Sequence, residues 1–138
     1  MLNEIAGDLF SSNDALAHCV SADLKMARGI AATFKAKFGG VDELRACTPK
    51  TGGCLFLQRD GRYIYYLVTK DRYYMKPTPA TLQSSLDAMK SLCMQHGVSS
   101  VSIPRIGCGL DRMDWTLVKT IIERVFFDGT VTVTAYTL

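Results

Sequence analysis

Apolar and polar positions along this chain predict strands and helices in alternation. Apolar residues at helical spacing predict helices over 30–38, over 41–47, from Pro79 to 96 and from 115 onward. Compact apolar runs predict strands over 2–6, 15–20, 54–58, 63–69 and 98–103, and the alternating segment 130–136 predicts a closing strand. This order predicts an α/β protein with a mixed sheet covered by helices on both faces.

Turn and cap residues support these boundaries. The pair Asp60-Gly61 separates two apolar runs and predicts a tight hairpin, because both central residues of that turn need positive φ. Thr78, followed by a proline, predicts the start of the long helix, and Gly97 predicts its end. Asp114 is the predicted N-cap of the last helix. We expect one domain over 1–138.

Composition restricts the class of protein. The 138 residues are 48% hydrophobic and 21% charged, which is typical of a globular chain with an ordinary core. The net charge of +3 is mild and its basic residues are scattered, which disfavours sequence-specific nucleic-acid binding but permits a small anionic ligand. No apolar run is long enough to span a bilayer, and the first ten residues do not resemble a signal peptide. We therefore expect no membrane contact and an intracellular location, in the nucleus or cytoplasm.

The cysteines argue against a disulfide framework and against zinc. Their number is odd, and no two have CxxC spacing. Most are expected to be reduced, small apolar residues: Cys19, Cys47, Cys54, Cys93 and Cys108.

Polar loops that follow predicted strands are the candidate ligand sites, because ligands of open α/β sheets bind beyond the carboxyl ends of strands. These loops are "GDLF", "SADLKMARG", "KDRYYMKPT" and "PRIGCGLDR". In the last, Gly107 and Gly109 let backbone N–H groups approach a phosphate, aided by the dipole of the helix near Asp114. The spacing is neither a P-loop nor a dinucleotide-binding fingerprint, so a glycine-rich turn without ligand is an equal alternative.

Two charged residues in these loops have competing interpretations. Lys70 ends an apolar strand, where it is a solvated lysine, a phosphate clamp or, if desolvated, an amine nucleophile. Asp111 precedes a helix, and its spacing favours a helix cap as long as nothing links it to Lys70.

Other reactive side chains are better interpreted as core residues. His18 and Cys19 are neighbours on one predicted strand and point to opposite faces, so they cannot form a catalytic pair. Three tyrosines of the hairpin strand are expected to be packing residues. Tyr73 and Tyr74, in a loop, are the better candidates for covering a ligand.

A family resemblance extends over nearly the whole chain. It rests on the segments "GDLF", "LAHCVS", "FKAKFGGVDEL", "RDGRYIYYLVTK", "KPT", "LDAMKSLC", "PRIGCGLDR" and "YTL". Together they resemble the macrodomains, and specifically the terminal ADP-ribose protein glycohydrolase subfamily, which also deacylates O-acetyl-ADP-ribose. The resemblance implies a three-layer α/β/α fold with a mixed, mostly parallel sheet of about six strands.

The resemblance also assigns ligand-binding parts. It implies that the Asp8 carboxylate accepts a hydrogen bond from adenine, with Leu9 beside it, and that Ser21 faces the nucleotide. Tyr136 and Leu138 would lie against the ligand. The loop that would surround the diphosphate and distal ribose is Arg105, Ile106, Gly107, Cys108, Gly109, Leu110 and Asp111.

The implied chemistry uses Lys70 as nucleophile and Asp111 as acid/base, without cofactor or metal. Attack of a neutral amine on the anomeric carbon would release a glutamate, aspartate or acetate carboxylate and leave a covalent lysyl intermediate. The implied partners are ADP-ribose, mono-ADP-ribosylated proteins and O-acetyl-ADP-ribose. The implied role is reversal of ADP-ribosylation, including in the DNA damage response. A monomer is expected.

One loop departs from the family pattern. Ala27 and Arg28 replace smaller or more flexible residues after Met26, and "DRYYM" after Lys70 is unusually aromatic. Arg28 would add a phosphate contact or crowd the distal ribose. A reader that binds ADP-ribose without turnover, and a phosphatase acting on ADP-ribose 1″-phosphate, therefore remain alternatives.

Overall fold

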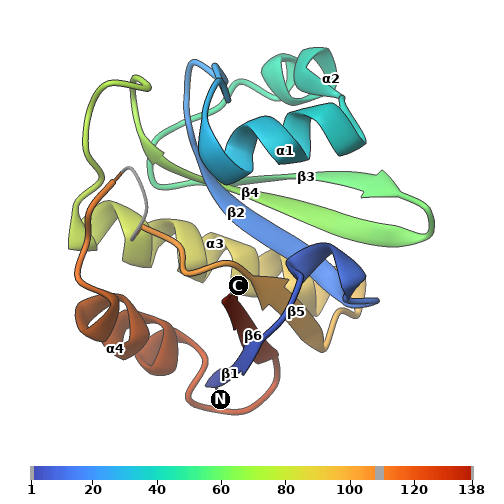
Figure 1. Ribbon diagram of the computed structural model, residues 1–138, viewed down its shortest axis with the longest axis vertical. Helices are drawn as coiled ribbons and strands as arrows, with labels where there is room; N and C mark the ends of the chain where they lie inside the picture. The colour runs from blue at the N-terminus through green and yellow to red at the C-terminus, as the bar shows by residue number, and fades with distance from the viewer. Residues whose placement is uncertain (1, 108–110, 138) are drawn as a thin grey trace.

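A six-stranded sheet between two helical layers forms the fold (Figure 1). The computed structural model describes residues 2–107 and 111–137. Its strands are β1 (Leu2–Ala6), β2 (Ala15–Ser21), β3 (Cys54–Arg59), β4 (Arg62–Lys70), β5 (Ser100–Ile103) and β6 (Thr132–Thr137). Its helices are α1 (Gly29–Phe38), α2 (Val41–Ala46), α3 (Pro79–His96) and α4 (Trp115–Val125), with a short 3-10 helix at Leu9–Ser11.

The sheet is mixed and mostly parallel, as predicted. Its strand order is β1-β6-β5-β2-β4-β3, and only the β3–β4 hairpin is antiparallel. Asp60 and Gly61 have φ of 52° and 78°, which confirms the predicted hairpin turn. The carboxyl ends of five strands therefore lie at one edge of the sheet.

Helices cover both faces, and each face has its own core (Figure 1). α1 and α2 lie on one side, over a cluster that includes Leu16, Phe34 and Tyr66. α3 and α4 lie on the other side, over a cluster that includes Met89 and Ile122. The three-layer prediction is confirmed.

Local capping explains where the helices begin. The Thr78 hydroxyl accepts the Thr81 N–H at 3.1 Å, and the Thr81 hydroxyl accepts the Thr78 N–H at 3.0 Å, so each side chain caps the other's backbone. Asp114 accepts the Thr116 N–H at 2.9 Å at the start of α4. Both predicted N-caps are confirmed.

Two predicted strands begin later than expected, and local hydrogen bonds explain both differences. The Val98 N–H donates to the Cys93 carbonyl at 2.8 Å, so Val98 completes the end of α3 and β5 begins at Ser100. The Thr130 N–H donates to the Asp128 carboxylate at 3.2 Å, and this turn delays β6 to Thr132. No helix in the described part of the chain is long and apolar enough to cross a membrane.

Candidate active site

A cavity of roughly 730 Å³ opens at the edge of the sheet where the parallel strands end. The loops after β2, β4 and β5 form its walls, together with the first residues of α1. Its described lining is Cys19, Val20, Ser21, Met26, Ala27, Arg28, Gly29, Ile30, Ala31, Lys70, Tyr73, Tyr74, Met75, Lys76, Pro104, Arg105, Ile106, Gly107 and Asp111.

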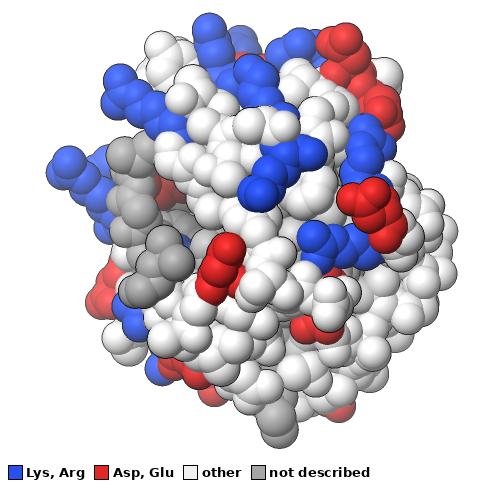
Figure 2. Space-filling model, turned by 45° about the vertical axis from the view of Figure 1, so that its right-hand side comes forward, with Lys and Arg blue, Asp and Glu red and all other residues white. Residues whose placement is uncertain are grey.

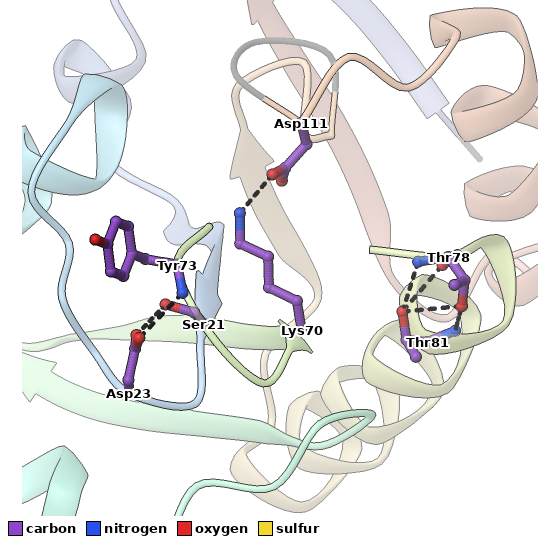
Figure 3. Close-up of polar contacts among 7 residues, drawn as sticks. All are labelled: Ser21, Asp23, Lys70, Tyr73, Thr78, Thr81 and Asp111. Carbon is purple, nitrogen blue, oxygen red and sulfur yellow. Dashed lines mark hydrogen bonds and ion pairs between the residues drawn. The ribbon is translucent and has the colours of Figure 1, made fainter. Parts of the chain in front are cut away.

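Lys70 and Asp111 meet inside this cavity. The Lys70 Nζ lies 2.6 Å from the Asp111 Oδ1, and the two side chains are only 14% and 15% exposed (Figure 3). Lys70 ends β4 and Asp111 follows β5, so they reach the pair from opposite sides of β2. The Asp111 carboxylate therefore bonds to Lys70, whereas Asp114 caps α4, and the interpretation of Asp111 as the helix cap is wrong.

A β-bulge sets the position of Lys70. Val20 of β2 pairs with Val68 of β4, but the next residue, Ser21, pairs with Lys70, which leaves Thr69 as an extra residue. An extra residue shifts the side chains that follow it to the other face of the ladder. The bulge therefore places Lys70, rather than Thr69, beside Ser21 in the lining of the cavity.

A second polar group links the loops after β2 and β4. The Ser21 hydroxyl donates to the Asp23 Oδ1, and the Tyr73 N–H donates to the Asp23 Oδ2 at 3.0 Å (Figure 3). The Lys25 N–H also donates to Asp23, at 3.3 Å. Partial burial acts to raise the pKa of Asp23, but the bonds from Ser21, Tyr73 and Lys25 outweigh it and hold the pKa below its ordinary value. Asp23 is thus a charged acceptor that ties the two loops together.

The N-terminus of α1 faces the cavity. Gly29, Ile30 and Ala31 belong to its first turn and line the space, and its N-cap, Arg28, makes no side-chain capping bond. First-turn N–H groups and the helix dipole favour an anion at this position. The sequence had pointed to the helix after Asp114, and no residue of that helix, α4, is among the lining residues that the structure describes.

The loop after β5 is anchored on its outer side. Arg105 lines the cavity, but its guanidinium lies 3.9 Å from the Glu4 carboxylate and over the Trp115 ring at 5.5 Å. Glu4 also accepts the Trp115 indole N–H at 2.8 Å. The Met113 N–H donates to the Gly107 carbonyl at 2.6 Å, which closes the loop on itself. Arg105, Ile106 and Gly107 thus form one wall, whereas the expected ligand residues Cys108, Gly109 and Leu110 lie outside the described residues.

The other expected ligand residues lie at the β1–β6 end of the same edge. The Asp8 carboxylate accepts the Phe10 N–H at 3.0 Å, and Leu9 is buried in the core under α1. Tyr136 packs against the same core and beside Gly7. Asp8, Leu9 and Tyr136 do not line the cavity that holds Lys70. Leu138 lies outside the described residues.

Residues interpreted from the sequence as packing residues do pack. His18 is fully buried, stacks on Phe34 at 3.8 Å between ring centroids, and lies on the opposite face of β2 from Cys19. Tyr65 and Tyr66 are buried. Tyr63 stacks on His96, with 4.1 Å between the ring centroids. Cys93 is buried and Cys19 and Cys54 are partly buried, whereas Cys47 is exposed, and these four cysteines are reduced.

Sequence reasoning missed two residues that shape the site. Asp23 follows Ser21 by two positions, a spacing that signals a local turn, but its bond to Tyr73 joins residues 50 positions apart. Glu4 lies on an edge strand, and no local signal predicts its contacts with Arg105 and Trp115.

Comparison with known proteins agrees with this architecture. The family model described as "Macro domain" matches residues 17–122. The human protein named ADP-ribose glycohydrolase OARD1 is 54% identical over 136 residues, covering 97% of this chain and 90% of its own, and the Bos taurus protein of that name is 53% identical over the same length and coverage. The macrodomain of Thermus aquaticus DarG superposes with a TM-score of 0.88 at 22% identity, over 100% of this chain and 99% of its own.

Proposed function

The chain belongs to the macro domain family, and we propose that it is an ADP-ribose hydrolase that removes mono-ADP-ribose from glutamate and aspartate side chains and deacylates O-acetyl-ADP-ribose. The observation that carries this proposal is the Lys70–Asp111 pair, 2.6 Å apart and largely shielded inside the cavity. The human relative's name, ADP-ribose glycohydrolase, supports the activity at 54% identity over nearly the whole chain.

The cavity has features that suit a sugar diphosphate. The first turn of α1 offers backbone N–H groups to phosphate oxygens, and Arg28 and Lys76 add positive charge to the lining. Ser21 and the wall of Ile106 and Gly107 would border the ribose next to Lys70. Asp8 and Leu9 would hold the adenine farther along the edge of the sheet, where the 3-10 helix presents them.

The proposed reaction begins with a proton transfer within the pair. Asp111 takes a proton from the Lys70 ammonium across the 2.6 Å hydrogen bond, which frees the amine lone pair. That lone pair forms a bond to the anomeric carbon of the distal ribose. The bond from that carbon to the ester oxygen breaks, and its electron pair leaves with the carboxylate of glutamate, aspartate or acetate, which takes the proton that Asp111 holds.

Water completes the cycle. The resulting lysyl nitrogen is bonded to the sugar, and Asp111, now a carboxylate again, lies beside it to accept a proton from an attacking water. The oxygen of that water bonds to the anomeric carbon as the carbon–nitrogen bond breaks, and the Lys70 nitrogen recovers its proton from Asp111. The sum is the addition of one water to one ester, with the enzyme unchanged.

The test compares wild type with Lys70→Ala and Lys70→Arg on a glutamate-linked mono-ADP-ribosylated protein. Both variants should lose ADP-ribose release by at least roughly a hundredfold, because arginine keeps the charge but cannot supply a neutral amine. Asp111→Asn should slow the second step and accumulate ADP-ribose mass on Lys70, detected by intact-protein and peptide mass spectrometry. Equal release by wild type and Lys70→Ala would eliminate the nucleophile assignment.

A reader function is the second candidate, and Arg28 is the observation that favours it. Its side chain lines the cavity at the start of α1 and makes no capping bond. A reader would bind ADP-ribose in calorimetry while wild type releases nothing from either ester, and Arg28→Gly, which removes the crowding side chain, would gain release. Release by wild type excludes this alternative.

A further inference from the structure

Two adjacent tyrosines stand at the open side of the cavity. Tyr73 is 55% exposed and Tyr74 is 73% exposed, although both contribute to the cavity lining. Their rings meet edge to face with 5.4 Å between centroids. The same loop exposes Met75, which is followed by Lys76, and both also line the cavity. We call Tyr73, Tyr74, Met75 and Lys76 the aromatic rim.

The rim is held in place rather than left as a free loop. Asp23 accepts the Tyr73 N–H at 3.0 Å, and the Lys25 Nζ lies 5.6 Å from the centroid of the Tyr73 ring. The Met75 N–H donates to the Arg72 carbonyl at 3.0 Å and closes a turn around the tyrosines. Exposed aromatic rings presented by a fixed backbone are typical of binding surfaces, because little conformational entropy is lost when they contact a partner.

The rim lies outside the reacting pair. Lys70 and Asp111 are about 15% exposed, whereas the tyrosines, three and four residues after Lys70, are more than half exposed. Figure 3 shows Lys70 at the end of β4 and Tyr73 on the loop that follows it, with Asp23 below the tyrosine. A polypeptide esterified to the sugar is too large for a space of roughly 730 Å³, so it must pass over the open side of the cavity.

The charge of this side favours an acidic chain. Among the described lining residues Asp111 is the one acid, and it is paired with Lys70. Lys76 belongs to the rim and Lys25 lies over its first ring. Over the upper half of the face drawn in Figure 2, the charged side chains are mostly Lys and Arg, with Asp and Glu among them toward the right.

We propose that the aromatic rim is a docking site for the acidic polypeptide segment that carries the esterified ADP-ribose, and that Asp23 is the residue that positions it. This inference rests on the proposed hydrolase function. The rim then selects substrates by their leaving group: it contacts a protein chain, but a single acetyl group in the cavity does not reach it.

The experiment compares two substrates on the same variants. One is a synthetic peptide with ADP-ribose on a central glutamate and aspartates on both sides, and the other is O-acetyl-ADP-ribose. In the Tyr73→Ala/Tyr74→Ala double variant, KM for the peptide should rise about tenfold or more with little change in kcat, since tyrosines are enriched among the few interface residues that carry most of the binding energy. KM for O-acetyl-ADP-ribose should rise by much less. The Tyr73→Phe/Tyr74→Phe variant should restore most of the peptide affinity.

Asp23→Ala tests the positioning role. It should raise KM for the peptide in the same direction and remove the hydrogen-exchange protection of the Tyr73 amide, which a loss of the rings alone would leave in place. Phe127→Ala is the matched control, because Phe127 is an aromatic residue with 81% exposure outside the cavity lining. Far-UV circular dichroism confirms that each variant is folded.

The outcomes separate the two proposals. If wild type hydrolyses neither ester, the proposed function fails and the docking site fails with it. If wild type hydrolyses both and the double alanine variant raises both KM values equally, or neither, the hydrolase stands and the docking site is overturned. A selective rise in KM for the peptide, reversed by phenylalanine, supports the docking site.

Discussion

His18 should make the stability of this fold depend on pH. Its imidazole is fully buried, stacks on Phe34, and meets the Tyr66 ring edge at 4.9 Å between centroids. Burial lowers the pKa of His18 from 6.5 to about 3, and the backbone of Cys19 opposes this only in part. The folded protein therefore keeps His18 neutral at pH values where the unfolded chain takes up a proton.

The sign and size of the effect follow from this difference. Because the folded pKa lies below the unfolded one, the stabilising contribution is complete above pH 6.5 and is lost as the pH falls toward 3. At pH 5, roughly 1.5 units below the ordinary pKa of histidine, protonation of the unfolded chain lowers the free energy of unfolding by about 2 kcal/mol. His18→Phe removes the titrating group and keeps an aromatic ring against Phe34.

The assay is urea unfolding followed by circular dichroism at pH 7.5, 6 and 5. Between the first and last pH, the free energy of unfolding of wild type should fall about 2 kcal/mol further than that of His18→Phe. His96→Gln is the control, since His96 is the other histidine of the chain and its ring bonds to the Tyr65 hydroxyl at 2.9 Å. If wild type and His18→Phe lose stability in parallel, burial of a neutral His18 does not shape the pH dependence.

Three further substitutions test packing, strain and charge. Thr69→Val should raise the free energy of unfolding by about 1 kcal/mol in urea, because the buried Thr69 hydroxyl has no hydrogen-bond partner among the described residues; a loss of stability would refute this. Gly40→Ala should lower it by roughly 1–3 kcal/mol in the same assay, since φ is +72° and a Cβ would lie 2.6 Å from the Leu57 Cδ1; an unchanged midpoint would contradict the strain. Lys90→Met should raise the pKa of Asp128 from about 2, because the Lys90 hydrogen bond is the largest cause of its low value; a carboxyl-carbon NMR titration measures it, and an unshifted midpoint would contradict the assignment.

Features set by neighbouring residues were predicted well. The turn at Asp60-Gly61 and the caps at Thr78 and Asp114 depend on the conformation of a few consecutive residues, and the structure confirms them. Lys70 was placed at the end of its strand for the same reason. In each case the residues that determine the local structure lie within a few positions of one another in the sequence.

Features set by the folded chain were not predictable from local pattern. Residue spacing left Lys70 and Asp111 as unrelated charges, and only the family resemblance joined them before the structure placed them 2.6 Å apart. The bond between Asp23 and Tyr73 depends on how two loops meet after β2 and β4 pair. No local signal tells which helix N-terminus faces the cavity, and the first turn of α1, which the sequence did not single out, contributes to the described lining.

The irregular pairing of Thr69 has a consequence for any attempt to stabilise this protein. A regular β2–β4 ladder would pair Ser21 with Thr69 and turn Lys70 to the other face of the sheet. A deletion at this position would remove both the bulge and a buried hydroxyl without a described partner, so a screen for thermal stability alone would favour it. The deletion would leave Lys70 directly after Val68 and opposite Ser21, but it would shorten the chain that leads to Tyr73 and displace the Tyr73 N–H from Asp23. Engineering libraries should therefore keep the length of 68–70 fixed and vary only the side chain of Thr69.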